Sequence, residues 1–525
     1  MAKMKVIPVF LAAALALTAC GGGAGNSPGT AGGDRVVAEG GQKYGGIVRL
    51  VMTGDTNAGY GLPSEVVSGM TAPLAAYAEC LLLESSGGEI SPWLATDWEI
   101  DLPNQRIIFT LRDDVKFHDG SDFNAEAVKW NVEMGIASGS MNPAIIGAEV
   151  LGDYEVEILL DNYTNAILNI FASHQFCMVS KENYETNGKQ YAMDNPVGTG
   201  PFKFKEQVPG QKIVYERFDG YWQAGQPYID TVEYITMTDV MTQIAAMQPN
   251  AADQISVLQT FAGDTVAQLL TSADVYVNKI GMGPMALFPN SVDADSPMSD
   301  VRVRQAISLA IDRDALVAAR GFGVFETSKQ LIPVSYAGAF DNPDTQKYKL
   351  YYDPEEARRL LAEAGYPDGF DTIIYGMAGD RDVVVGIQEQ LAAIGINAAL
   401  EYPESGAATE LRSNGWDGML FFAFRALASI SSTFRLHVDP DYQFFPSMWR
   451  PADEMRDLYI EARTSETVQP ELFQQLQAML MEDMVLIPVY DAYDAYVVQN
   501  KVKDSGFGDW GVGTIWLPGE AWIDD

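Results

Sequence analysis

Two hydrophobic periodicities alternate along this chain, and the alternation constrains its fold more than any other feature. Short β-branched runs with the period of a strand, such as 47–51, 107–111 and 155–159, are separated by stretches with the period of an amphipathic helix. Further strand-like runs lie at 212–215, 231–235, 275–277, 372–375 and 485–490. This order of strands and helices indicates an α/β protein with mixed sheets, and no internal repeat of fixed period is visible.

Two helical segments carry clear signals. Asp353-Pro354-Glu355-Glu356 predicts a helix start, with Asp353 as N-cap, Pro354 in the first turn and Glu356 reaching back to the N-cap. Gly365 marks the expected end of that helix. A second helix that packs one face on a core is predicted from an apolar stripe through Val303, Ile307, Ile311, Ala315 and Ala318.

The first twenty residues have the pattern of a bacterial export signal. Lys3 and Lys5 flank the start of an apolar run that reaches Ala19 and is too short to span a bilayer. The run ends in Leu17-Thr18-Ala19-Cys20, which resembles a lipobox, so we expect residues 1–19 to be removed and Cys20 to be lipidated. The alternative is an ordinary signal peptide with a chance cysteine. Residues 20–43, rich in glycine and small residues, predict a flexible tether.

Composition argues against several classes of function. The chain has 34 Lys and Arg against 71 Asp and Glu, a net charge of −37, so we expect no nucleic acid partner. Removal of the signal would take away two lysines, leaving 32 − 71 = −39. Hydrophobic residues make up 47% of the chain, enough for large buried cores. Three cysteines and three histidines are few for a structural metal centre, and we expect no cofactor and no metal site.

Catalytic motifs are mostly absent. We find no nucleophile elbow, zinc-protease motif or phosphate-binding loop. Residues 506–511 match G-x-G-x-x-G, but no helix follows them, so a loop is expected there. His118, His174 and His437 are too scattered in sequence to suggest a metal triad. We therefore expect no enzymatic activity.

Cys80 and Cys177 remain once Cys20 is set aside. In an exported protein they could pair, and a disulfide between them would close a loop of about 97 residues. The alternative is two separate buried thiols that act as small hydrophobic residues. The sequence leaves both readings open, because it does not reveal the distance between the two cysteines.

Five sequence blocks, in order, cover nearly the whole mature chain and resemble one family. They begin at Pro92, Asn195, Tyr221, Asp300 and Tyr352, and include Phe117-His118-Asp119-Gly120, Asn195-Pro196-Val197-Gly198-Thr199-Gly200-Pro201-Phe202, Ala310-Ile311-Asp312-Arg313 and Tyr352-Asp353-Pro354. Together, and behind a lipobox, they resemble family 5 of the extracytoplasmic solute-binding proteins, which serve peptide and nickel ABC importers. These blocks are scaffold signatures and say little about the ligand.

The resemblance implies a fold and a division of the chain. The fold would be a two-lobed, periplasmic-binding-protein-like (class II) clamshell of α/β type, with mixed sheets and an inserted subdomain in the first lobe. The first lobe would comprise residues 44–285, with the inserted subdomain at about 80–185. The second lobe would comprise 286–484, and residues 485–525 would return to the first lobe.

The resemblance also implies a function. The chain would be the substrate-binding component of an ABC importer, capturing a peptide or peptide-like solute between its lobes and delivering it to a membrane permease with its ATPase subunits. We expect a monomer held at the membrane by its lipid. The alternatives are a nickel-chelate uptake receptor on the same fold, a secreted hydrolase, and a purely structural surface lipoprotein.

Candidate ligand-binding residues lie between 416 and 449. In peptide carriers of this family, a strand here leads into the cleft, and an acidic residue just past it pairs with the α-amino group of the peptide. The corresponding residues 424–429 contain no acid and one arginine, Arg425. Arg425 would suit a carboxylate, with walls from Trp416, Phe422, Phe424 and Trp449. The alternative is that Arg425 is a surface residue at the end of a strand and that the aromatic residues belong to the core.

Overall fold

The computed structural model describes most of the chain beyond residue 37. The described residues are 38, 40–52, 60–66, 72–247, 251–257, 267, 269, 271, 274–320, 325–427, 429–439, 445–448, 452–507, 509 and 516–524. The expected signal peptide, Cys20 and most of the tether lie outside this set, as does Trp449. No described helix combines the length and the hydropathy that a bilayer crossing requires.

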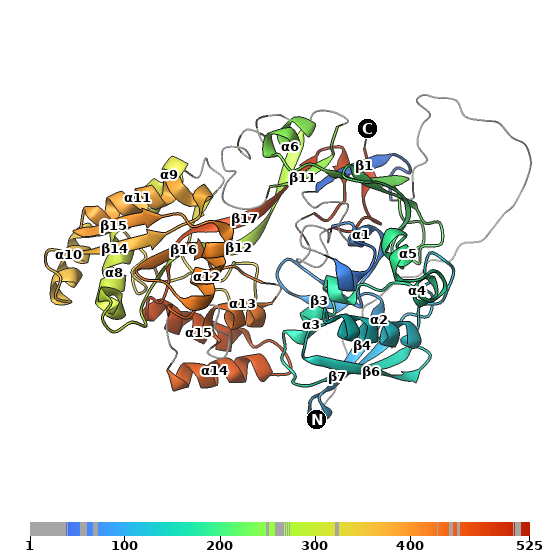
Figure 1. Ribbon diagram of the computed structural model, residues 1–525, viewed down its shortest axis with the longest axis horizontal. Coiled ribbons are helices and arrows are strands. Elements are labelled where there is room, and N and C mark those ends of the chain that lie inside the picture. Colours follow the sequence, from blue (N-terminus) through green and yellow to red (C-terminus); the bar gives the residue numbers. More distant parts are fainter. Residues whose placement is uncertain are drawn as a thin grey trace, which may run out of the picture.

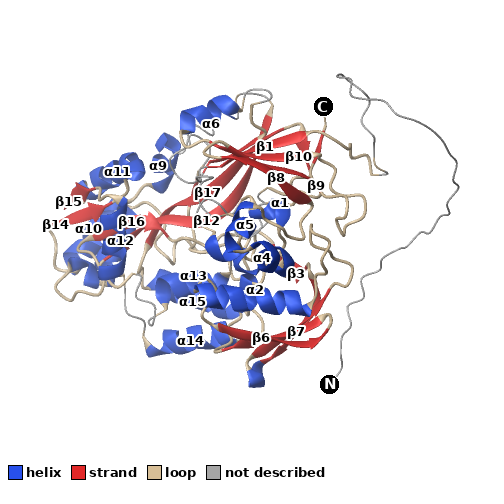
Figure 2. Cartoon of the chain, turned by 45° about the vertical axis from the view of Figure 1, so that its right-hand side comes forward, coloured by secondary structure: helices blue, strands red, loops and turns tan. Residues whose placement is uncertain are grey.

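One mixed sheet runs through both halves of the described molecule (Figures 1 and 2). Its strand order is β15-β14-β16-β12-β17-β11-β1-β10-β9-β8, and β13 pairs with β17 beside this path. Neighbours pair parallel in β1–β10 and β14–β15 and antiparallel in β12–β17 and β9–β10. The strands are β1 Ile47–Met52, β8 Phe202–Val208, β9 Lys212–Arg217, β10 Thr231–Thr236, β11 Gln254–Val257, β12 Val275–Pro289, β13 Glu326–Thr327, β14 Phe370–Tyr375, β15 Ile396–Glu401, β16 Met419–Ala423 and β17 Ile487–Gln499.

The long strands β12 and β17 join the two halves. Their antiparallel pairing runs from Val275 opposite Gln499 to Leu287 opposite Ile487. At one end β17 pairs with β11, and at the other β12 pairs with β16. We call the half that contains β1 and β8–β11 lobe 1, and the half that contains β14–β16 lobe 2. The register of the ribbon shifts between Gly281 and Gly283, which places an irregularity between the lobes.

Helices cover both faces of the sheet in lobe 2. Because side chains alternate along β16, Phe421 faces a core made with α8–α11, whereas Leu420 faces a second core made with α13–α15. The helices are α8 Val301–Ala310, α9 Arg313–Arg320, α10 Pro354–Glu363, α11 Arg381–Ala392, α12 Ser405–Asn414, α13 Ile430–Val438, α14 Asp453–Thr464 and α15 Pro470–Glu482.

Lobe 1 carries a separate four-stranded antiparallel sheet with the order β4-β5-β7-β6. We call the part of the chain built around this sheet, which has its own hydrophobic core, the inserted subdomain. Its strands are β4 Ala95–Asp101, β5 Arg106–Leu111, β6 Ile145–Gly152 and β7 Glu155–Leu160, beside the hairpin β2 Leu82–Glu84 and β3 Ile90–Pro92. The helices of lobe 1 are α1 Leu74–Tyr77, α2 Ala125–Ser138, α3 Ile167–Ile170, α4 Lys181–Asn187, α5 Lys189–Asp194 and α6 Val240–Ala246, and β18 Val502–Lys503 pairs with β19 Trp522–Ile523 near the C-terminus.

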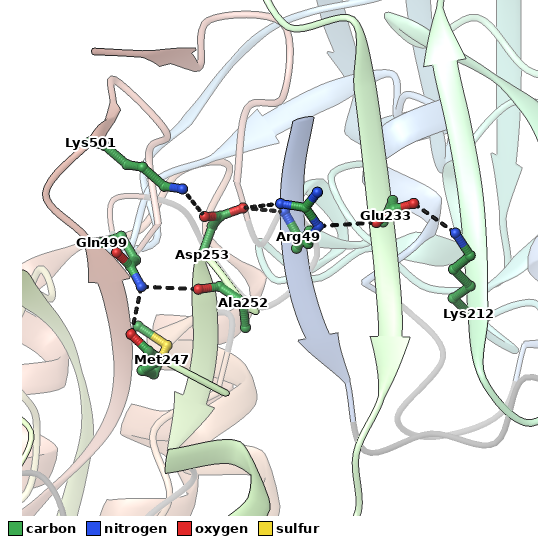
Figure 3. A network of polar contacts seen from close by, with 8 residues as sticks. All are labelled: Arg49, Lys212, Glu233, Met247, Ala252, Asp253, Gln499 and Lys501. Carbon is green, nitrogen blue, oxygen red and sulfur yellow. Dashed lines mark hydrogen bonds and ion pairs between the residues drawn. The ribbon is translucent and has the colours of Figure 1, made fainter. Parts of the chain in front are cut away.

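A network of charged and polar groups around the buried Asp253 anchors β17 in lobe 1 (Figure 3). The fully buried Asp253 carboxylate accepts the Arg49 backbone N–H at 2.8 Å and lies 2.7 Å from Lys501 Nζ. Arg49 Nε lies 3.3 Å from Glu233 on β10. Gln499, at the end of β17, donates to the carbonyls of Met247 and Ala252 at 2.7 and 3.1 Å. Since a buried carboxylate is costly without partners, this network fixes the end of the strand.

The helix at 354–363 confirms most of its sequence signals. Asp353 Oδ1 accepts the Glu356 N–H at 2.9 Å, Pro354 is the first helical residue, and Gly365 has φ +98° just past the helix. The expected reach of Glu356 back to the N-cap is wrong. The Asp353 N–H donates instead to Leu309 O. The Glu356 carboxylate receives two hydrogen bonds from Arg359, each 2.7 Å long.

The single helix expected at 303–318 is two helices, α8 and α9. The chain leaves the helical conformation at Ile311 (φ −91°, ψ 110°), and Asp312 Oδ1 accepts the Ala315 N–H at 2.9 Å to start α9. The break shifts the phase of the stripe, so that Ala315 and Ala318 are exposed. Buried Arg313 fills the corner and donates to Pro488 O on β17 at 2.7 Å.

Candidate functional site

Arg425 lies on a segment that continues β16 along the hinge strand β12. The Phe424 N–H donates to Pro284 O and the Ala426 N–H to Met282 O, both at 2.8 Å. Gly283 (φ +84°) permits this approach, because a Cβ there would lie 2.3 Å from Phe424 O. Arg425 itself is exposed, and within the described residues its guanidinium has neither a hydrogen bond nor an ion pair. The segment therefore carries an uncompensated cation beside the hinge.

The aromatic candidates divide between core and surface. Phe424 and Trp416 are buried in the core that β16 forms with α13–α15, and Trp416 Nε1 donates to Phe288 O at 2.9 Å. Phe422 is half-buried, with the Arg412 guanidinium 4.6 Å from the centre of its ring. Trp449 lies outside the described residues. Of the candidates that the structure describes, Arg425 and Phe422 are the ones whose side chains reach solvent, and their contact with a ligand stays a prediction.

The acids nearest to Arg425 in sequence do not supply a free countercharge beside it. Asp417 precedes β16, so the whole strand separates it from Arg425. Asp439 Oδ2 lies 3.1 Å from Arg463 Nη1 in an ion pair. The described part of this region offers a ligand a cation, and neither acid is placed to receive an ammonium group.

A buried acid that the sequence reasoning missed lies in lobe 1. Glu79 Oε1 accepts hydrogen bonds from Tyr221 Oη, Trp93 Nε1 and Trp222 Nε1 at 2.7, 3.0 and 3.2 Å. Burial raises the pKa of this carboxyl to about 7, against the lowering effect of the hydrogen bonds. An acid within the apolar run 74–83 was the available signal. A cavity lined in part by Trp93, Tyr221 and Trp516 adjoins this carboxyl.

The structure describes the side chains of two of the three histidines, His118 and His174. The half-buried His118 has its Nε2 atom 2.9 Å from Gly200 O, and desolvation lowers its pKa to about 4. Burial also lowers the pKa of His174. The His437 side chain lies outside what the structure describes. Among the described residues, no three His, Cys, Asp or Glu side chains cluster as metal ligands.

Two α/β lobes, joined by a long two-stranded ribbon and flanked by an exposed unpaired arginine near the ribbon, define a two-lobed clamshell binding protein. The sequence profile described as "Bacterial extracellular solute-binding proteins, family 5 Middle" matches residues 89–432. The chain belongs to this family, which confirms both the resemblance and the fold expected from the sequence.

Curated relatives are similar over most of the chain. The glutathione-binding protein GsiB of Salmonella typhimurium is 29% identical over 409 residues, which cover 72% of this chain and 76% of that protein. GsiB of Escherichia coli O157:H7 is 30% identical over 324 residues, which cover 58% of this chain and 60% of that protein.

Solved structures share the fold at lower identity. HbpA2 from Haemophilus parasuis has a TM-score of 0.79 at 20% identity, covering 91% of this chain and all of that one. NikA from Brucella suis, in complex with Fe(III)-EDTA, has a TM-score of 0.75 at 21% identity, with coverage of 91% and 100%. DppA from Helicobacter pylori, in complex with the peptide STSA, has a TM-score of 0.69 at 23% identity, with coverage of 92% and 99%.

The structure brings the two remaining cysteines together. Cys80 Sγ and Cys177 Sγ lie 3.2 Å apart as buried free thiols in the hydrophobic core of lobe 1. The hydrogen bond with Cys177 and burial both raise the pKa of the Cys80 thiol, so its reactive thiolate is disfavoured in the folded chain. Pairing would therefore have to form during folding, before the thiols are buried. Such a disulfide stays a prediction.

We predict that mature protein exported under oxidising conditions contains a Cys80–Cys177 disulfide. The link would stabilise the fold by about 2–5 kcal/mol because it restricts the unfolded chain. Thiol titration of the denatured, unreduced protein should find no free thiol, and peptide mass mapping should find the two peptides joined. Protein expressed in a reducing compartment is the control. Two titratable thiols in the exported protein would contradict the pairing.

Proposed function

We propose that the chain is the substrate-binding component of an ABC importer that captures a peptide or peptide-like solute and delivers it to a membrane permease. Membership of an extracellular solute-binding family carries this proposal. Relatives named as glutathione-binding proteins support a peptide-like ligand. We further propose that the chain acts as a monomeric, non-enzymatic carrier, with lobes at 44–285 and 286–484 and a segment 485–525 that returns to the first lobe.

Capture would work by a shift between open and closed forms. A solute that contacts both lobes binds the closed form more tightly than the open one, and this difference in affinity drives closure. The ribbon of β12 and β17 supports this mechanism, because its register irregularity at Gly281–Gly283 lies between the two lobes. No chemical step on the solute is needed.

The chemistry near Arg425 favours a ligand that bears a carboxylate. A guanidinium holds a carboxylate through two parallel hydrogen bonds. An ammonium group desolvated here would lack a countercharge, because Asp439 is already paired with Arg463. We propose that a ligand carboxylate lies at Arg425 and that a free peptide amino terminus is poorly accommodated there.

Glutathione, a tripeptide with two free carboxylates, is the first ligand to test. We predict that the mature protein binds it in calorimetry and that X-ray scattering gives a smaller radius of gyration with saturating ligand than without it. Mass spectrometry should recover the tripeptide intact. An unchanged radius at saturation would contradict capture by closure, and steady cleavage of the tripeptide would contradict a carrier.

A nickel-chelate receptor is the second candidate, since the Brucella suis NikA fold is similar. Calorimetry with nickel, with and without a small chelating acid, separates the two proposals. Heat from the nickel chelate, with none from glutathione or other peptides, would favour the metal receptor.

The Arg425→Ala variant tests the proposed ligand contact. Loss of a charge-paired hydrogen-bond donor in a closed cleft should weaken ligand binding by about 2–5 kcal/mol. Calorimetry on the variant and on wild type measures this difference. A ligand with a blocked amino group should bind at least as well as its free-amine form.

Arg456→Ala is the matched control, because Arg456 is an exposed arginine on α14 and its removal changes the net charge equally. Its binding should match wild type. If Arg425→Ala also binds like wild type, or if acetylation of the amino group abolishes binding, the carboxylate contact is wrong.

We also propose that Cys20 anchors the protein to the membrane through a lipid after cleavage of residues 1–19. A tether from such an anchor would raise the local concentration of loaded carrier at the permease. We predict that Cys20→Ala releases the protein into the medium, as measured by immunoblotting of cell and medium fractions. A variant that stays at the membrane without lipid on any residue would rule out this anchor.

A further inference from the structure

The loop after β7 in the inserted subdomain reaches across to lobe 2. Asn165 is the centre of this contact. Its backbone N–H donates to Arg463 O at 2.9 Å and its side-chain amide donates to Ala462 O at 2.8 Å. Its side-chain oxygen accepts a hydrogen bond from the Ser431 hydroxyl of α13. The backbone N–H and both side-chain polar groups of Asn165 thus have partners in lobe 2, and the residue is only 3% exposed.

A second residue of the same loop extends this contact. The buried Tyr163 hydroxyl donates to Glu466 O, just beyond α14, at 2.7 Å. The Tyr163 N–H is held at 2.6 Å by the Gln105 side chain of the inserted subdomain, and the Asp161 N–H donates to Ala144 O at 2.9 Å. Because the loop is fixed to its own subdomain, it presents Tyr163 and Asn165 to lobe 2 in a preset geometry.

The acceptors on lobe 2 belong to the C-terminal end of α14. The last carbonyls of a helix have no partner within the helix and must find one elsewhere. Asn165 supplies two donors to these carbonyls, Ala462 O and Arg463 O, and so caps a helix of the opposite lobe. Separation of the lobes would leave these carbonyls and the Asn165 amide to water. A rotation that parts the lobes at this point would therefore have to break the contact.

The contact lies away from the ribbon that joins the lobes, so rotation of one lobe against the other acts on it directly. Figure 1 shows the ribbon of β12 and β17 near the middle of the molecule, with α13 and then α14 below it. The capped helix α14 thus lies away from the ribbon that joins the lobes. A contact at this distance from a hinge is broken by a small rotation.

We propose that Asn165 and Tyr163 form a latch that stabilises the closed form without contacting the ligand. The proposal rests on the proposed function, in that closure is what captures the solute. Part of the measured ligand affinity then comes from these two residues, because the latch lowers the free energy of every closed molecule, loaded or empty. The latch positions the lobes and leaves the choice of ligand to the cleft.

The test compares Asn165→Ala and Tyr163→Phe with Asn162→Ala. Asn162 is exposed in the same loop, and within the described residues its side chain has no hydrogen bond, so its removal is the matched control. X-ray scattering at a glutathione concentration near the wild-type dissociation constant should give a larger radius of gyration for Asn165→Ala than for wild type or the control, because fewer molecules of the variant are closed. Circular dichroism and thermal unfolding check that each variant is folded.

Binding kinetics with glutathione give the second readout. One net hydrogen bond corresponds to a factor of about 2 to 12 in an equilibrium constant. We expect Asn165→Ala to raise the dissociation constant about tenfold or more and Tyr163→Phe to raise it less. The change should lie in the dissociation rate, because the latch closes after encounter. A residue that only supports the local fold would instead lower the fraction of active protein.

The outcomes separate the latch from the proposed function. If wild type binds neither glutathione nor other peptides, the proposed function fails, and the latch that rests on it fails too. If wild type binds and Asn165→Ala has the same radius of gyration at that ligand concentration, the latch alone is overturned. An affinity and a dissociation rate equal to those of Asn162→Ala overturn it as well.

Discussion

The ribbon of β12 and β17 is the constraint on which the rest of the molecule depends, because it is continuous with the sheet of each lobe. Both ends are pinned by buried polar groups. In lobe 1, Gln499 and the Asp253 network hold the end of β17 (Figure 3). In lobe 2, the Nε–H of Arg313 donates a hydrogen bond to Pro488 O at 2.7 Å. The register irregularity at Gly281–Gly283 is left between these anchors. Bending should therefore concentrate there rather than at either end.

The same geometry explains why the family's sequence blocks are scaffold rather than ligand site. Gly198 and Gly200 press against the backbone of α1, where an added Cβ would lie 2.1 Å from Tyr77 O or 2.7 Å from Ala76 O. Arg304 and Arg313 are buried and donate to carbonyl oxygens, Arg304 to Asp483 O at 2.6 Å. Residues of this kind fix the lobes and the ribbon for any ligand. Specificity must come from segments between the blocks, such as the one with Arg425.

The sequence predicted what local periodicity determines and missed what distant pairing determines. All eight predicted strands are present, but the run 275–277 grew into a fifteen-residue strand. Its extension contains Gly281, Gly283 and Pro284, which weaken a strand pattern, and it is ordered by its pairing with β17. Arg425 was found because the family resemblance directs attention to the residues just past this strand, where an arginine stands in place of an acid. The burial of Phe424 was not predicted, since it depends on where α13–α15 pack. Asn165 gave no signal, because its partners are about 300 residues away.

A carrier must close on its solute and then reopen to release it. This requirement limits how much of the free energy of closure the latch can supply and how much must come from the ligand. Each latch hydrogen bond replaces one to water, so it contributes only about 0.5–1.5 kcal/mol net. A shift from 1% to 99% closed needs about 5.5 kcal/mol of differential affinity. The latch hydrogen bonds come from the side chains of Tyr163 and Asn165 and from the Asn165 backbone amide. They can supply only part of this free energy of closure, once the entropy of ordering both surfaces is subtracted. The remainder must come from the solute itself. A much stronger latch would close the empty carrier and hold the loaded one shut at the permease, so a modest latch is the arrangement that lets the ligand decide the state.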